Sequence, residues 1–179
     1  MTASATPGLA RLNAADATGA AALLREVCAS REWCAAVAAG RPYDGLPALL
    51  AAGGRATAGL SDDGLAEAVA GHPPIGRPGG GASAREQSGV QESERADLLA
   101  LNLAYQERHG HVFLICATGR TGAEVRAALL ARIGNDADTE REIVRAELGE
   151  INRIRLARLA ADPGAEAAPD PYDPVEDPR

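Results

Sequence analysis

The stretch TEREIVRAELGEINRIRLARLAA, residues 139–161, decides the fold class of this chain. It predicts the last and longest helix of the protein. The dipeptide Asp162-Pro163 ends that helix, because proline lacks a backbone N–H and disfavours helical geometry in the residue before it. Ile151 and Arg155 are four residues apart, so they lie near one face of this helix. An arginine on an inner face needs an anionic partner, because an unpaired buried charge is very costly.

The composition of the whole chain agrees with a helical fold. Its 179 residues suit one domain, and 46% of them are hydrophobic. Most of these are alanine and leucine, with one Phe, one Trp and three Tyr. Such residues favour helix-to-helix contacts, whereas a β-sandwich needs β-branched and aromatic side chains. We therefore predict an all-α, single-domain bundle of about seven or eight helices.

Capping residues and glycines predict where the other helices begin and end. The run VFLICA, residues 112–117, fits either a buried extended segment or the start of a helix. The predicted helices are one that follows Asn13 through LLREVC, REWCAAVAA between Ser30 and Gly40, LPALLAA up to Gly53-Gly54, LAEAVA between Ser61 and Gly71, one from Ser93 to Gly110, and VRAALLARI between the capping box of Thr121 and Glu124 and Gly134.

The remaining segments are predicted to be irregular. Residues 71–87, GHPPIGRPGGGASAREQ, hold three prolines and five glycines, so their first part is a loop. Residues 162–179 carry six acidic residues, one arginine and five prolines, a composition that cannot bury enough apolar surface to fold. We expect a flexible N-terminus over 1–10, a helical domain over 11–161 and a disordered acidic tail over 162–179.

The absence of lysine excludes several kinds of chemistry. All 18 basic residues are arginine. Schiff-base catalysis, a pyridoxal phosphate anchor, a biotin attachment and the phosphate-binding GK(S/T) motif each require a lysine amine. The net charge of −7 also argues against nucleic acid as a partner, because binding to phosphates needs a basic surface.

The chain is expected to be cytoplasmic. It has no apolar run of about 20 residues that could span a membrane. Its N-terminus lacks the basic and apolar segments of a signal peptide. Cys28, Cys34 and Cys116 are odd in number and lack metal-ligand spacing, so we interpret them as small core residues rather than as disulfide or zinc ligands.

Besides Arg155, two side chains, His72 and Glu86, are candidates for chemistry. His72 lies in the Pro/Gly loop; a lone histidine is more often structural, but imidazole is the group best suited to proton exchange near neutral pH. Glu86 could equally be the returning half of a capping box with Ser83. His109 and His111 flank the glycine that ends a helix, and we interpret them as surface residues.

Seven short motifs in order give the chain a resemblance to a known family. From about Leu12 to Leu159 it resembles the 2-oxo-4-hydroxy-4-carboxy-5-ureidoimidazoline (OHCU) decarboxylases of uric acid breakdown. The motifs are LN (Leu12, Asn13), W…RP(F/Y) (Trp33, Arg41-Pro42-Tyr43), HPxIG (His72 to Gly76), SxxEQ (Ser83 to Gln87), LNxxY (Leu101, Asn102, Tyr105), GxxF(I/V/L)x(C/V)A (Gly110 to Ala117) and E(I/L)xxIxR(L/I)RL (Glu147 to Leu156).

The resemblance implies a fold, a reaction and a site. It implies an all-helical homodimer that uses no cofactor or metal and decarboxylates OHCU to (S)-allantoin. The catalytic residues it implies are His72, Glu86 and Arg155, with Arg153 and Arg158 open as alternatives to Arg155. The substrate contacts it implies are Pro73, Ser83, Ala84, Arg85, Gln87, Phe113, Leu114, Ile115, Cys116 and Ala117.

Two features depart from the family pattern, and two other functions are weighed beside it. The loop after His72 is shorter than in animal members and contains Gly-Gly-Gly, and His111-Val112 stand where those members have an aromatic residue and proline. The alternatives are a non-catalytic helical interaction domain and a related lyase that acts on another ureide or carboxylated heterocycle.

Overall fold

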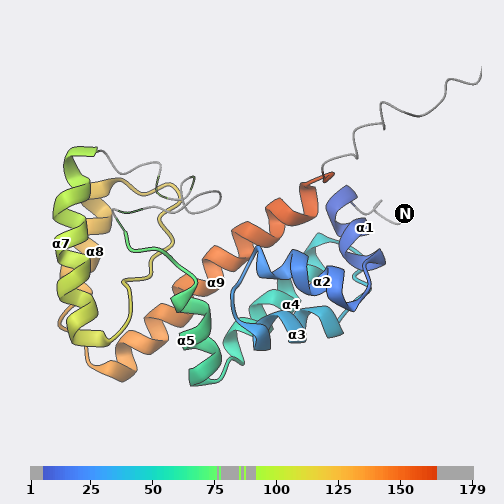
Figure 1. The fold of residues 1–179 in the computed structure, drawn as a ribbon, viewed down its shortest axis with the longest axis horizontal. Coiled ribbons are helices and arrows are strands. Elements are labelled where there is room, and N and C mark those ends of the chain that lie inside the picture. Colours follow the sequence, from blue (N-terminus) through green and yellow to red (C-terminus); the bar gives the residue numbers. More distant parts are fainter. Residues whose placement is uncertain (1–5, 76, 78–84, 86, 88–91, 165–179) are drawn as a thin grey trace, which may run out of the picture.

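The computed structural model describes residues 6–75, 77, 85, 87 and 92–164. These residues form eight helices and no strand, which confirms the predicted fold class (Figure 1). The helices are α1 (Pro7–Ala14), α2 (Ala17–Arg25), α3 (Arg31–Ala39), α4 (Leu46–Ala58), α5 (Asp62–Ala70), α7 (Glu92–His109), α8 (Gly122–Arg132) and α9 (Ala137–Ala161).

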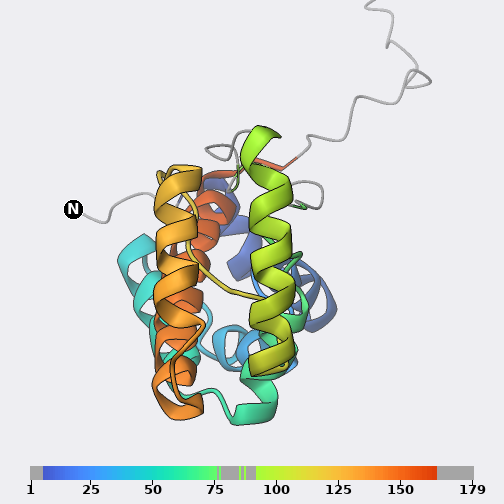
Figure 2. The ribbon, with the colours of Figure 1, turned by 90° about the vertical axis from the view of Figure 1, so that its left-hand side faces the viewer.

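Helix α9 crosses the molecule from one end to the other (Figure 1). Helices α1 and α4 pack directly on it, and α3 packs on α2, α4 and α5. Helices α7 and α8 pack on each other at the end of the molecule that lies away from α1 to α4, as Figures 1 and 2 show. The long helix thus connects two groups of helices.

Each group of helices has its own hydrophobic cluster. The larger cluster gathers side chains from α1 to α5 and α9, including the fully buried Trp33 and Leu156. The smaller cluster lies between α7 and α8 and includes Leu98 and Leu129. Trp33 therefore belongs to the core.

Residues 112–117 join the two clusters. They form neither helix nor strand. Phe113, Ile115 and Ala117 belong to the smaller cluster, whereas Leu114 belongs to the larger one. Such alternation is typical of an extended chain, in which successive side chains point to opposite sides. Of the two structures that the sequence allowed for this run, the buried extended segment is therefore the one observed.

The N-terminal boundary predicted from the sequence is wrong. Helix α1 begins at Pro7, inside the stretch expected to be flexible, because proline is well suited to the first helical turn and Leu9 is buried. Asn13 lies within α1 and caps no helix; its side chain instead bonds the backbone N–H and C=O of Tyr43, both at 2.9 Å. The N-cap of α2 is Asp16, whose carboxylate accepts from the N–H of Gly19.

Helix α4 does not stop at Gly53-Gly54 as predicted but continues to Ala58. Gly53 is buried, and a Cβ atom there would overlap the side chain of Leu156 on α9. The glycine therefore permits close approach of two helices rather than ending one.

The other predicted helix limits agree with the structure to within a few residues. Ser30 and Ser61 cap α3 and α5, Thr121 and Glu124 form the capping box of α8, Gly110 follows α7 with a φ of 79°, and α9 ends before Asp162-Pro163. The predicted tail lies outside the described residues from 165 onward. No helix of the described ranges is both long and apolar enough to cross a bilayer.

Candidate functional site

A small pocket brings together most of the described residues that the sequence assigns to substrate. Its volume is about 20 Å³, roughly the space that one water molecule occupies. The walls come from the loop after α5, from Gln87, from the extended segment and from α9. The described lining residues are His72, Pro73, Ile75, Gln87, Phe113, Leu114, Ile115, Ala117 and Ile151.

The end of α5 fixes the position of His72. Gly71 caps the helix, and a Cβ atom there would overlap the side chain of Ala29, so the helix end packs tightly on the chain before α3. The N–H of His72 donates to the carbonyl of Val69 at 3.0 Å. Pro73 follows with its restricted backbone. The backbone that carries the imidazole is therefore held in place, and His72 lies half-buried at the pocket.

Arg155 lies one turn beyond the pocket residue Ile151 on α9. Its guanidinium is half-buried and Nη1 donates to the carbonyl of Val27 at 3.0 Å. Arg153, in contrast, is exposed and pairs with Glu150 at 3.0 Å. Among the arginines that the sequence left open, Arg153 therefore faces solvent, while Arg155 and the half-buried Arg158 do not.

The remaining residues that the sequence assigns to the site do not line the pocket or lie outside the described residues. Arg85 is described and exposed. Cys116 is half-buried but does not line the pocket; its backbone N–H donates to Glu147 at 2.8 Å. Ser83, Ala84 and Glu86 lie outside the described residues.

Side chains hold the backbone of the extended segment in place. The N–H of Phe113 donates to Asn102 at 3.2 Å, and Arg132 donates to the carbonyl of Leu114 at 2.9 Å. Arg120 donates from Nε to the carbonyl of Cys116 at 3.1 Å. The wall of the pocket is therefore positioned by α7, by α8 and by the loop before α8.

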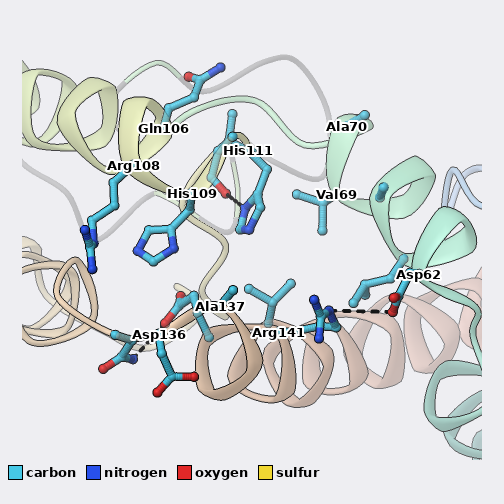
Figure 3. A pocket seen from close by; sticks show the side chains of 17 residues that line it. Asp62, Val69, Ala70, Gln106, Arg108, His109, His111, Asp136, Ala137 and Arg141 are labelled. Atoms are coloured by element: carbon cyan, nitrogen blue, oxygen red, sulfur yellow. Dashed lines mark hydrogen bonds and ion pairs between the residues drawn. The ribbon is translucent and has the colours of Figure 1, made fainter.

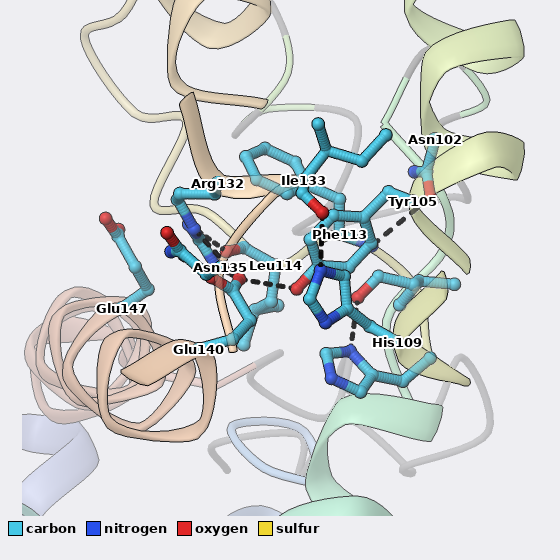
Figure 4. Close-up of polar contacts among 12 residues, drawn as sticks. Asn102, Tyr105, His109, Phe113, Leu114, Arg132, Ile133, Asn135, Glu140 and Glu147 are labelled. Carbon is cyan, nitrogen blue, oxygen red and sulfur yellow. Dashed lines mark hydrogen bonds and ion pairs between the residues drawn. The ribbon is translucent and has the colours of Figure 1, made fainter. Parts of the chain in front are cut away.

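A buried ionic cluster that sequence reasoning missed supports this wall (Figure 4). Arg132 donates to one oxygen of Glu140 at 2.6 and 3.0 Å, and the Tyr105 hydroxyl donates to the same oxygen at 2.5 Å. Asn135 donates to the other oxygen at 2.8 Å. The Arg132 guanidinium also lies 4.5 Å from the centre of the Phe113 ring. The only sequence signal was Tyr105, the last residue of LNxxY.

The environment of Glu140 favours its charged form. Burial alone would raise the pKa of this carboxyl, but the hydrogen bonds from Arg132, Tyr105 and Asn135 outweigh burial and lower the pKa below its usual value. Burial, together with the contact to Glu140, raises the pKa of the Tyr105 hydroxyl strongly, so this group stays protonated. The cluster is thus a fixed ion pair rather than a proton-exchange site.

A much larger cavity, of about 870 Å³, lies between α5, the end of α7 and the start of α9 (Figure 3). His109 and His111 line it, and both rings contact the Tyr105 ring: that of His109 is tilted against it with centroids 4.4 Å apart, and that of His111 meets it edge-on at 5.6 Å. Both are half-buried, so the prediction that they are surface residues is wrong. His72 lines the smaller pocket and not this cavity, and we place the candidate site in the smaller pocket for that reason; Arg155 is not among the lining residues of either.

Two of the three cysteines agree with their interpretation as small core residues. Cys28 and Cys34 are buried, whereas Cys116 is half-buried, and none of the three forms a disulfide with another described residue. Burial raises the pKa of Cys28, and it raises the pKa of Cys34 to about 11, so both stay protonated at neutral pH. Among the described residues no group of three or more His, Cys, Asp and Glu side chains could hold a metal ion.

Comparison with known proteins adds independent information. The sequence model of a family described as OHCU decarboxylase matches residues 13–157. The chain is 34% identical over 108 residues to "Uric acid degradation bifunctional protein TTL" of Arabidopsis thaliana, which covers 54% of this chain and 33% of that protein. It is 32% identical over 87 residues to "Uric acid degradation bifunctional protein PucL" of Bacillus subtilis (strain 168), covering 46% of this chain and 18% of that protein. The match thus spans a third or less of each relative.

Two solved structures resemble the fold. A crystal structure of OHCU decarboxylase in the presence of (S)-allantoin matches with a TM-score of 0.70 and 27% identity, covering 77% of this chain and 96% of that one. A crystal structure of (S)-allantoin synthase matches with a TM-score of 0.63 and 20% identity, covering 84% of this chain and 53% of that one. The second likeness concerns the fold alone.

Proposed function

This chain belongs to the OHCU decarboxylase family, and we propose that it decarboxylates 2-oxo-4-hydroxy-4-carboxy-5-ureidoimidazoline to (S)-allantoin. One observation is the main support for this proposal. Residues of three separate family motifs line one pocket: His72-Pro73, Gln87, and the segment 113–117 except Cys116. A helical module that only binds another protein does not require an imidazole, an amide and a backbone segment in that arrangement.

The substrate explains why these groups suffice. Its carboxylate sits on the ring carbon that also carries the hydroxyl, next to the imine carbon that carries the ureido group. When the bond to the carboxylate breaks, carbon dioxide leaves and the electron pair passes into the neighbouring imine, which is conjugated with the ring carbonyl. A proton then adds to the carbon that carries the ureido group, and the hydroxyl loses its proton to become the second ring carbonyl of allantoin. The protein has to orient the substrate, stabilise its charge and deliver that proton on one face.

We assign each group a role in that reaction. Arg155 binds an anionic oxygen of the substrate and fixes its pose. Gln87, with Glu86 from outside the described residues, holds the ureido N–H groups and the hydroxyl. His72 delivers the proton to one face of the ring, which gives a single enantiomer.

Replacement of Arg155 by alanine should raise KM by about tenfold to a hundredfold, because a hydrogen bond to a charged group contributes about 1.5–3 kcal/mol. Initial rates over a range of substrate concentrations measure this change, with circular dichroism as the check on folding. Arg153→Ala is the matched control, since Arg153 is exposed on the same helix. A normal KM for Arg155→Ala with a raised KM for Arg153→Ala would reverse the assignment.

The direct test of the function uses OHCU generated in place from urate by urate oxidase and hydroxyisourate hydrolase. We expect this protein to accelerate the absorbance decay of OHCU and to yield optically active allantoin, as followed by circular dichroism. Decay at the spontaneous rate with a racemic product, from folded protein, would rule out the proposed reaction. It would then favour a related ureide substrate or a role in binding.

Three further features belong to the proposal. We propose that the protein needs no cofactor, that it forms a homodimer as its family resemblance implies, and that it works in the cytoplasm. Light scattering on the purified chain measures the mass in solution, and activity after dialysis against a chelator tests independence of metals.

A further inference from the structure

Two charged side chains hold the peptide groups of Cys116 on both sides. Glu147 on α9 accepts the Cys116 N–H with Oε2 at 2.8 Å, and Arg120 donates from Nε to the Cys116 carbonyl at 3.1 Å. Arg120 Nη2 also lies 3.8 Å from Glu147 Oε1. The Glu147 side chain is only 18% exposed, against 42% for Arg120. Glu147, Arg120 and the backbone of Cys116 thus form a closed ring of contacts.

This ring matters because no strand of the described part of the chain lies beside the segment around Cys116. An extended chain is normally fixed by a ladder of backbone hydrogen bonds to a neighbouring strand. The described residues contain no strand, so hydrogen bonds from side chains take the place of such a ladder and hold the backbone of residues 112–117 in position. Asn102 and Arg132 hold the start of the segment, and Glu147 holds the N–H at its far end.

Helix α9 relates this contact to the rest of the candidate site. Glu147, Ile151 and Arg155 are spaced four residues apart, so they lie on successive turns of one helix. At a rise of about 1.5 Å per residue, Glu147 and Arg155 are roughly 12 Å apart along the axis. Between them, Ile151 lines the small pocket. The same rigid helix therefore carries the support of the pocket wall and the proposed substrate-binding arginine.

We propose that Glu147 is a positioning residue for the decarboxylation. Its carboxylate fixes the Phe113–Ala117 wall relative to Arg155, and so sets the pose of the substrate ring relative to His72. Glu147 does not line the pocket, so it acts through the backbone of Cys116. The inference rests on the proposed function for its kinetic consequences, but the contact itself is testable without substrate.

Glu147→Ala should lower kcat/KM by about tenfold to a hundredfold, the loss expected when reacting groups are displaced by about 1 Å. It should also lower the optical purity of the allantoin, after subtraction of the spontaneous reaction. A mere loss of folded protein would reduce the rate without changing the enantiomer ratio of the enzymatic product. Glu147→Gln should restore most of both values, because its amide oxygen can still accept the Cys116 N–H.

Two variants and one spectroscopic measurement complete the design. Glu150→Ala is the control, since Glu150 is exposed on the same helix and its side chain pairs with Arg153 at 3.0 Å; it should behave as wild type. Glu147→Asp, one methylene shorter, keeps the charge and serves if the alanine variant does not fold; it should also lose activity. Amide hydrogen exchange at Cys116, followed by NMR, should be slow in wild type and faster in Glu147→Ala.

The outcomes separate this inference from the proposed function. If wild type does not accelerate OHCU decay, the proposed function fails, and the exchange rate at Cys116 alone then decides whether Glu147 holds the segment. If wild type is active, unchanged kcat/KM and optical purity in folded Glu147→Ala or Glu147→Asp would overturn the inference. An equal loss in Glu150→Ala would overturn it as well, because the effect would not depend on the Cys116 contact.

Discussion

Replacement of His72 by alanine should lower kcat by about 10²–10⁴-fold, the range typical of a general acid or base. The imidazole lies half-buried at the small pocket, anchored by the capped end of α5 and by Pro73. Its loss should leave the substrate bound but without a proton donor on the reacting face. Stopped-flow absorbance gives kcat, and circular dichroism of the product shows whether protonation is still confined to one face.

His109→Ala is the control for this variant. It removes a second half-buried imidazole, one that lines the larger cavity and bonds the carbonyl of Ile133 at 3.2 Å. We expect its kcat to stay near that of wild type. If His72→Ala turns over normally, His72 has no part in the reaction; if only His109→Ala is impaired, the chemistry belongs to the larger cavity.

The sequence predicts those parts of the fold that depend on near neighbours. Ser61 and Thr121 cap their helices through atoms three residues away, so the cap can be read from local sequence. Asn13 has the same chemistry, but its partner is the backbone of Tyr43, thirty residues on. Gly53 likewise resembles a helix end, yet its role depends on Leu156 from the far end of the chain. Long-range contacts of this kind leave no local pattern.

The candidate site divides in a similar way. Side chains that touch the pocket, such as His72 and Gln87, belong to family motifs and could be named from sequence. Arg132 and Glu140 could not, because charged residues on helices are usually solvated and only their mutual contact explains their burial. Glu147 lies within a motif, but its partner is a backbone N–H, which carries no sequence signal.

Replacement of Glu140 by alanine should lower the free energy of unfolding by about 3–5 kcal/mol, the usual cost of leaving one member of a buried ion pair alone. Arg132 is 7% exposed and Glu140 1%, so water cannot replace the lost carboxylate. The Tyr105 hydroxyl and Asn135 would lose their acceptor as well. Urea unfolding followed by circular dichroism measures the change. Arg141→Ala, which removes solvent-exposed ion pairs with Asp138 and Asp62, should cost much less.

The same cluster predicts a dependence on pH. The folded protein holds the pKa of Glu140 below its usual value of 4.5, so ionisation of this group stabilises the fold above that pH. The stabilisation should be lost as the pH falls below 4.5 and through the lower pKa of the folded state. Glu140→Gln removes the titrating group and should show a shallower loss of stability in that range. Equal acid sensitivity of wild type and Glu140→Gln would mean that other carboxylates, such as those of the helix caps, dominate acid unfolding. A free energy of unfolding of Glu140→Ala near that of wild type would show that the buried ion pair contributes no net stability.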